Sequence, residues 1–280
     1  MTPRRVITRA AGVIAGLLLF LFLTLHFIPN RALQGVAERA AAREGYTLAI
    51  TGFGKAFPVG IKAHRIEIAS EKGPLLVLDG PVIRLQLLPL MIGKVRLHCA
   101  ARVGGGDLDA VATISGPGRL RLDGSGIRTE DIPWFRTVAG ARVKGKMGFE
   151  LDAAGPLSKA DGSVRVEVKG ADLKGVAIHG VPLPDAGFDT VRGALKITGG
   201  TATLESFALQ GPSMYMRLKG TVTLGNSLGA SPINMTLEMM PQPAFLEDQK
   251  LVFLLLARYM VTPGQYAVPI TGTFAAPVIR

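Results

Sequence analysis

The feature that most constrains the fold of this 280-residue chain is a two-residue alternation of apolar and charged side chains. In residues 164–169, three valines alternate with Arg165, Glu167 and Lys169. Successive side chains of a β-strand point to opposite faces of a sheet, so this segment is predicted to be a strand with one covered and one solvated face. The same pattern predicts strands at residues 119–123, 146–151, 195–197 and 214–219.

Glycine and proline separate these segments and predict turns between successive strands. The expected turns lie at Gly104-Gly105-Gly106, Gly116-Pro117-Gly118, Asp123-Gly124, Asp161-Gly162, Gly199-Gly200 and Gly211-Pro212. Gly124-Ser125-Gly126 is likewise interpreted as a turn. The sequence therefore predicts a mainly β protein, built as a folded-over antiparallel meander with a few short helices.

Three segments have helical character. Asn30 is expected to cap a helix that runs to about Arg43 and packs against the first strand, and Gly45 is expected to end it. A short helix is predicted near residues 132–138 and a longer one at 245–260. The longer helix is interpreted as a plug at one end of the folded sheet, and the alternative is docking at a membrane interface.

The N-terminal region predicts a membrane anchor. Residues 6–28 are mostly apolar, carry Arg9 near their start as the one charged residue, and are long enough to span a hydrocarbon core of ~30 Å. Arg4, Arg5 and Arg9 lie before or at the start of this stretch and place the N-terminus in the cytoplasm, although the arginines that follow it dilute the bias. Residues 26–30 offer no small-x-small cleavage site, so the segment is expected to remain as a signal anchor. The predicted divisions are a stub and anchor at 1–29, a juxtamembrane helix at 30–45 and an exported β-rich domain at 46–280.

The net charge of +11 could indicate a nucleic-acid partner, but the basic residues are dispersed and not gathered into a stripe. They are expected at outward strand positions, as at Arg65, Arg84, Arg96, Arg121, Arg165, Lys196 and Arg217. We interpret them as a solvated basic face, with weak attraction to anionic lipid headgroups as the alternative. No nucleic-acid binding is predicted.

Residue patterns that support catalysis or metal binding were not found in the sequence. His64, His98 and His179 are isolated, and His98 and Cys99 on one strand would point to opposite faces. Asp107 and Asp109 follow a triple-glycine turn and are interpreted as a hairpin shoulder. The sequence has neither a nucleophile elbow nor a phosphate-binding or dinucleotide-binding glycine motif, and its single cysteine allows no intramolecular disulfide. No catalytic, metal-binding or cofactor-binding residue is predicted, although a pair of carboxylates that meet only in space stays open.

Several stretches together resemble a known family. They are residues 81–90 running into Gly93-Lys94, residues 176–178 leading to Pro182 and Pro184, residues 211–213 followed by 218–220, residues 231–235, and the Pro-Ile-x-Gly-Thr ending at 269–273. In this order after a signal anchor, the chain resembles type II secretion system protein N and, more distantly, AsmA-like envelope proteins.

The resemblance implies a taco-like or tubular sheet with a hydrophobic inner face, in a bacterial inner-membrane protein whose bulk is periplasmic. It implies a non-enzymatic subunit of the type II protein secretion machinery that acts in assembly through other secretion components. The alternative is a lipid-binding or lipid-handling envelope protein with lipid in a hydrophobic groove. A dry core would favour the first function and an open groove the second. The residues expected to form that core are Leu120, Leu122, Phe149, Leu151, Val164, Val166 and Val168.

Overall fold

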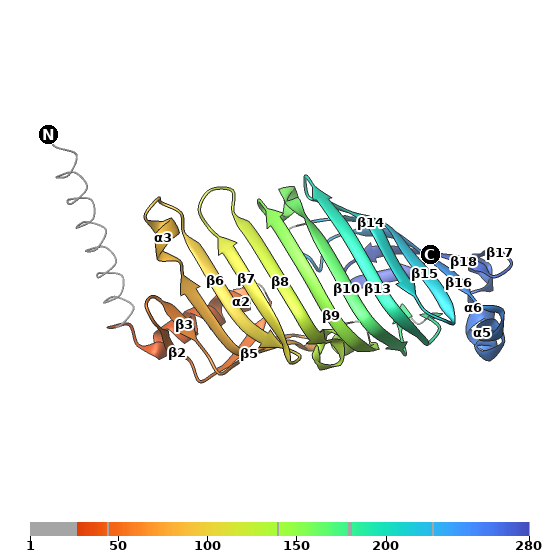
Figure 1. Cartoon of the computed structure of the whole chain (residues 1–280), viewed down its shortest axis with the longest axis horizontal. Helices are drawn as coiled ribbons and strands as arrows, with labels where there is room; N and C mark the ends of the chain where they lie inside the picture. The colour runs from red at the N-terminus through yellow and green to blue at the C-terminus, as the bar shows by residue number, and fades with distance from the viewer. Residues whose placement is uncertain (1–26, 44, 139, 179–180, 226, 280) are drawn as a thin grey trace.

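The computed structural model describes residues 27–279, apart from residues 44, 139, 179, 180 and 226. The protein is mainly β, and its strands follow one another as an antiparallel meander (Figure 1). The predicted fold class is confirmed in this respect. No helix within the described part of the chain has the length and apolar character needed to cross a membrane. The predicted anchor falls outside the described residues except at Phe27 and Ile28.

Seventeen strands form one sheet. Those of the N-terminal half are β1 (Thr47–Thr51), β2 (Gly54–Ala56), β3 (Gly60–Lys62), β4 (Arg65–Ser70), β5 (Gly73–Leu85), β6 (Arg96–Val103), β7 (Gly106–Thr113), β8 (Arg119–Arg128) and β9 (Arg142–Ala154). Those of the C-terminal half are β10 (Asp161–Lys174), β13 (Ala186–Thr198), β14 (Thr201–Gln210), β15 (Met214–Thr223), β16 (Ile233–Pro241), β17 (Met260–Thr262), β18 (Gln265–Thr273) and β19 (Ala276–Ile279). A separate pair is formed by β11 (Ala177–Ile178) and β12 (Val181–Pro182).

Neighbouring strands pair in chain order along most of the sheet. The pairing runs from β4 through β10 to β13 and on to β16, β18 and β19. At the N-terminal end, β1 pairs with β4, and β3 joins β2 to the second half of β5. The short strand β17 pairs with β18. The sheet is open, with β1 and β19 at its two edges.

The helices are short and lie at the margins of the sheet. They are α2 (Asn30–Arg43), α3 (Leu87–Leu90), α4 (Trp134–Thr137), α5 (Pro243–Asp248) and α6 (Lys250–Leu255), with 3-10 turns η1 (Thr129–Asp131), η2 (Leu157–Lys159) and η3 (Ala257–Tyr259). The helix predicted from Asn30 is present. Its first hydrogen bonds run from the amides of Ala32 and Leu33 to the carbonyl oxygen of Pro29, so Asn30 lies inside the helix and is not its cap. The predicted helix at 245–260 is divided into α5, α6 and η3.

The alternation of β10 is confirmed by its register. Val166 lies opposite Phe149 of β9 and Gly193 of β13. Directly opposed residues in an antiparallel pair share a face, so these three lie on the inner face of the sheet. Arg165 and Glu167 point to the outer face.

Two predicted turns are wrong, because Asp123-Gly124 and Gly124-Ser125-Gly126 lie inside β8. The register with β9 shifts between Gly124 and Ile127, which identifies a bulge within the strand. A Cβ atom at Gly124 would overlap the ring of Phe149, so this glycine makes room for an aromatic side chain. Asp161-Gly162 also belongs to a strand, at the start of β10. The turns at Gly104-Gly105, Gly116-Pro117-Gly118, Gly199-Gly200 and Gly211-Pro212 are confirmed.

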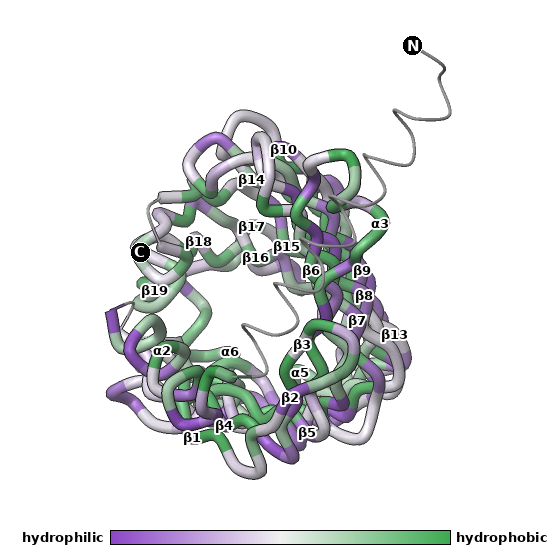
Figure 2. The backbone as a smooth tube through the Cα atoms, turned by 90° about the vertical axis from the view of Figure 1, so that its left-hand side faces the viewer, coloured by the Kyte–Doolittle hydropathy of each residue, from purple (hydrophilic) through white to green (hydrophobic). Residues whose placement is uncertain are grey.

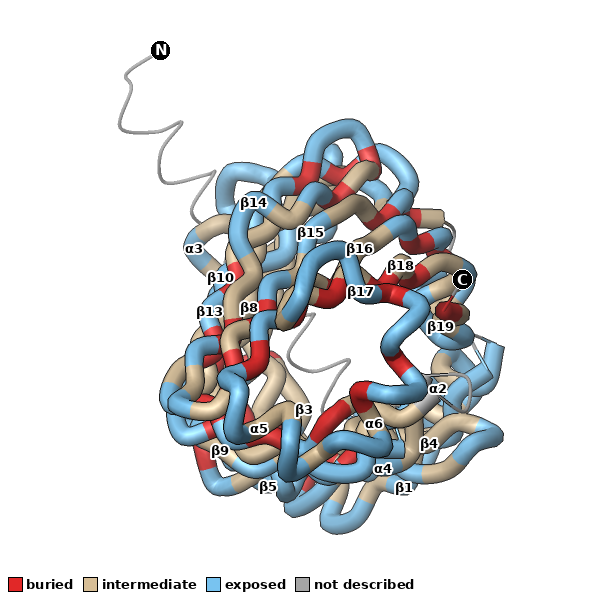
Figure 3. The backbone as a smooth tube through the Cα atoms, turned by 90° about the vertical axis from the view of Figure 1, so that its right-hand side faces the viewer, coloured by how far each residue is buried: buried red, intermediate tan, exposed pale blue. Residues whose placement is uncertain are grey.

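Buried apolar residues form two separate clusters. The larger lies on the inner face of the C-terminal half and includes Met239 and Val268, both 0% exposed. The segment of α6 and η3 packs against it through buried Phe253, Leu256 and Tyr259, and α6 lies at the end of the sheet that faces the viewer in Figure 3. The predicted helical segment therefore packs on the inner face, and its closure of the sheet end stays a prediction. The smaller cluster consists of Val103, Ile127 and Ile132, with α4 residues packed against it.

The sheet curls so that turns from its two ends meet. Lys72 in the β4–β5 turn donates a hydrogen bond from Nζ to the carbonyl oxygen of Ala275 at 3.4 Å. The rings of Trp134 in α4 and Phe274 in the β18–β19 turn have centroids 6.2 Å apart. Seen end-on, the strands surround a common centre, and α2 occupies the angle between β1 and β19 (Figure 2).

Candidate functional site: the inner face of the sheet

An unbroken apolar row crosses six strands on the inner face. We call it the middle row, and its cross-strand partners in order are Cys99, Ala110, Leu122, Leu151, Val164 and Leu195. All six residues are half-buried, and none is fully covered by protein. At about 4.8 Å between neighbouring strands, the row is about 24 Å long. An acyl chain, which spans half of a ~30 Å hydrocarbon core, could lie along it.

The middle row lies next to a covered region. The lower end of the inner face is closed by buried Val103, Ile127 and Val191, which belong to the two apolar clusters. Within the described residues, Val164 alone of the middle row packs against the larger cluster. Leu122 and Leu151 belong to neither cluster. Protein therefore covers the lower end of this face but leaves the middle row half-exposed.

The dry core expected from the sequence is not present. Leu120 is 39% exposed, and the other six residues assigned to that core are half-buried. The physical reason is the length of the covering elements, because α4 has four residues and α6 has six. Each reaches one end of the sheet only. The sequence correctly predicted which side chains share the inner face but not that they remain uncovered.

Glycines shape the floor next to the middle row. Gly124 on β8 and Gly193 on β13 lie in the neighbouring row with Phe149 and Val166 between them. A Cβ at Gly193 would overlap the ring of Phe207, so that ring, like the ring of Phe149, packs directly over a glycine.

The middle row carries almost no titratable chemistry. Its only ionisable residue is Cys99, and burial followed by the nearby Asp109 charge raises the pKa of this thiol. The thiol therefore stays neutral at physiological pH. As predicted, His98 points to the opposite face, where its Nε2 contacts an Asp109 carboxylate oxygen. The inner face thus suits an apolar ligand and offers no activated nucleophile.

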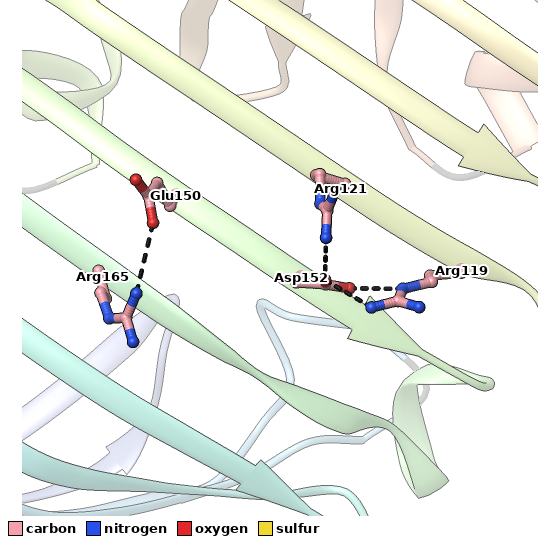
Figure 4. A network of polar contacts seen from close by, with 5 residues as sticks. All are labelled: Arg119, Arg121, Glu150, Asp152 and Arg165. Carbon is pink, nitrogen blue, oxygen red and sulfur yellow. Dashed lines mark hydrogen bonds and ion pairs between the residues drawn. The ribbon is translucent and has the colours of Figure 1, made fainter.

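The outer face is polar, and several of its charges form ion pairs. Arg119 makes a bidentate contact with Asp152, from Nε to Oδ1 and from Nη2 to Oδ2, each at 2.7 Å (Figure 4). Arg121 donates to the same carboxylate at 2.8 Å. These hydrogen bonds, that from Arg119 first, lower the pKa of Asp152 to about 2. Arg165 pairs with Glu150 at 3.5 Å.

One hollow beside these ion pairs is lined by charged residues that already have partners. It has a volume of about 610 Å³ and lies over Gly148, where a missing side chain leaves space. The charged residues around it pair with each other, since Glu150 contacts Arg165 and Glu167 contacts Arg192. A ligand would have to compete with these pairs.

The other residues considered from the sequence are dispersed. Six of the seven predicted outward cations are exposed and Arg96 is half-buried, which confirms a solvated basic face. Asp107 and Asp109 lie on the outer face of β7, as a hairpin shoulder requires. No group of His, Cys, Asp and Glu able to hold a metal ion occurs within the described residues.

No family model matches the chain, and no curated protein or solved structure is significantly similar to it. The uncovered middle row is the feature that sequence reasoning missed. A signal for it was present in the scarcity of helical residues able to cover so long an apolar face.

Proposed function

We propose that this protein is a non-enzymatic, membrane-anchored lipid-binding protein that holds an acyl chain on the middle row of its inner face. The observation that supports this proposal is the half-exposed state of all six residues in that row. A large apolar surface left open on a folded domain is typical of a ligand or interaction site. Because side chains alternate between the two faces of a strand, the outer side of the same strands carries the charged residues. The inner and outer faces therefore differ in polarity.

The energetics suit reversible lipid binding. Each methylene gains about 0.8 kcal/mol when it leaves water for an apolar surface, and the bilayer offers the same gain. A chain that moves from the bilayer to the middle row therefore exchanges one apolar environment for another at little net cost. The neutral Cys99 thiol adds no charge that would oppose this transfer.

The anchor belongs to the same proposal. Residues 6–28 are mostly apolar, with Arg9 near their start as the one charge, and are long enough to span a bilayer, and Arg4, Arg5 and Arg9 favour a cytoplasmic N-terminus. We place the protein in a bacterial inner membrane, with residues 46–280 in the periplasm. The polar face of the sheet would then be in contact with water.

An assembly subunit of the type II secretion machinery is the second candidate. It is favoured by exposed apolar residues of α6 and β17, which could contact another protein. They are Leu251, Leu254, Leu255, Met260 and Val261, each at least 50% exposed. Genes for a secretin, a secretion ATPase and pseudopilins beside this gene would favour this candidate, as would impaired export of folded periplasmic proteins when the gene is deleted.

The test of lipid binding uses two adjacent positions of β10 that face opposite sides. Val164→Trp places a large ring on the middle row, whereas Arg165→Trp places the same ring on the outer face. Phospholipid that copurifies with the full chain is quantified by mass spectrometry. We expect Val164→Trp to reduce the bound lipid and Arg165→Trp to leave it unchanged. Equal lipid content in both variants and the wild type would contradict the proposal.

A further inference from the structure

Two loops at one rim of the sheet form a single exposed apolar surface, which we call the rim patch. Its residues are Leu88, Met91, Ile92 and Ile114, which are 80%, 53%, 72% and 61% exposed. The first three belong to α3 and the loop after it, and Ile114 follows β7. This rim lies in the N-terminal half of the sheet, and α3 is at the other end of the molecule from α5 and α6 (Figure 1).

Hydrogen bonds hold the two loops together. The amide of Ile114 donates to the carbonyl oxygen of Val95 at 2.9 Å, and the amide of Val95 donates to Oγ of Ser115 at 3.1 Å. The α3 loop is also closed on itself, since the amide of Lys94 donates to the carbonyl oxygen of Pro89 at 3.0 Å. The exposed side chains therefore project from two loops that hydrogen bonds hold together.

The rim patch continues the inner face. Ile114 is two residues beyond Ala112, and Val95 is two residues before Leu97, so each lies on the inner side of its strand line. Leu97 and Ala112 are opposed to each other, one row above the middle row. An apolar path thus leads from the rim patch onto the proposed acyl-chain site.

Cations flank the rim patch on the outer side. A hollow of about 220 Å³ is lined by Arg96, Arg119 and Arg121, together with Gln86, Val111 and Thr113. Asp152 is the one acidic partner of Arg119 and Arg121 among the described residues, which leaves an excess of positive charge there. Residues 81–106 contain four basic and no acidic residues, among them Lys94 at the rim itself.

We infer that the rim patch inserts into the bilayer that holds the anchor, with the adjacent arginines in contact with anionic lipid phosphates. This inference rests on the proposed membrane-anchored function. Apolar side chains flanked by Lys and Arg are the chemistry that a bilayer interface accepts, and each cation near an anionic surface adds to the attraction. The proposed anchor leads into α2, which packs against β1. Since β1, α3 and the β5–β7 strands all belong to the N-terminal half of the chain, the part of the sheet that carries the rim follows the anchor closely along the chain.

The test places a fluorescent probe at the rim of the full chain. In a Cys99→Ala background, single cysteines at Ile92 and, as a matched control, at Leu254 of α6 are labelled with an environment-sensitive dye. Leu254 is 68% exposed, so both labels begin at exposed aliphatic positions. The labelled proteins are reconstituted into nanodiscs of phosphatidylethanolamine and phosphatidylglycerol that contain spin-labelled lipid.

We expect quenching of the dye at residue 92 and none at residue 254. Arg96→Gln combined with Arg119→Gln should weaken the quenching at residue 92 in anionic nanodiscs and change nothing in zwitterionic ones. Absent quenching at residue 92 would overturn the inference, and equal quenching at both positions would do so too, because the contact would not be specific to the rim. Contact with acidic proteins or with a second copy instead would leave residue 92 unquenched. The readout does not depend on lipid on the middle row, so it is independent of the Val164→Trp test.

Discussion

Replacing leucine with alanine at two positions of the inner face measures how well each is packed. Leu237 of β16 is 7% exposed within the larger cluster, whereas Leu151 of β9 is half-buried in the middle row. Both lie in strands, so the change in β-propensity is similar and largely cancels in the comparison.

The expected losses differ because only one site leaves a cavity. Leu237→Ala removes fully buried carbons inside packed surroundings and should cost about 3–4 kcal/mol. Leu151→Ala removes three carbons that are about half covered, which at ~0.8 kcal/mol per buried methylene gives about 1 kcal/mol. For a domain of this size, 1 kcal/mol lowers the melting temperature by roughly 2–4 °C.

Thermal unfolding of the purified protein, followed by circular dichroism, provides the assay. We expect a decrease of roughly 2–4 °C for Leu151→Ala and of roughly 6–16 °C for Leu237→Ala. Equal decreases would refute the reasoning, because they would mean that the middle row is as tightly packed as the cluster around Leu237.

Three further predictions follow from particular contacts. Gly124→Ala should destabilise the protein by about 1–3 kcal/mol through overlap with the ring of Phe149, and most of this cost should vanish in a Phe149→Ala background; additive costs in a double-mutant cycle would contradict it. Asp152 has a pKa of about 2 in the folded state, below its ordinary unfolded value of about 3.9, so its stabilisation is present above about pH 4 and is lost as the pH falls toward 2. The melting temperature of the wild type should therefore exceed that of Asp152→Asn at pH 6 by more than at pH 2.5, and a constant difference would refute this assignment. An alkaline phosphatase fused after residue 280 should be active if the anchor has the proposed orientation, and an inactive but intact fusion would contradict it.

The facing of the strand side chains follows closely from the sequence. Alternation alone places Arg165 and Glu167 outside and the valines of β10 inside, because a strand has a side-chain period of two. The turns at Gly199-Gly200 and Gly211-Pro212 are predictable for a related reason. Each pair interrupts an alternating segment, and the residues directly before and after it are polar, so the apolar alternation stops there.

The failures have a common cause, which is tertiary context. Gly124 has the local appearance of a turn, but its role is to accommodate Phe149 from the next strand, 25 residues later in the chain. No local pattern carries this information. The exposure of the middle row is equally non-local, because it depends on how far α4 and α6 reach across the sheet. The rim patch is non-local too, because its link to Ile114 depends on hydrogen bonds between two loops.

The most direct test of the account is photocrosslinking in living cells from two neighbouring positions of β10. A photoreactive amino acid at Val166 faces the open inner side, whereas one at Glu167 faces the outer side. Lipid adducts are identified by mass spectrometry after purification. The account predicts phospholipid adducts from position 166 and none from position 167. Adducts to secretion proteins from position 167, with no lipid at position 166, would contradict it and favour an assembly subunit.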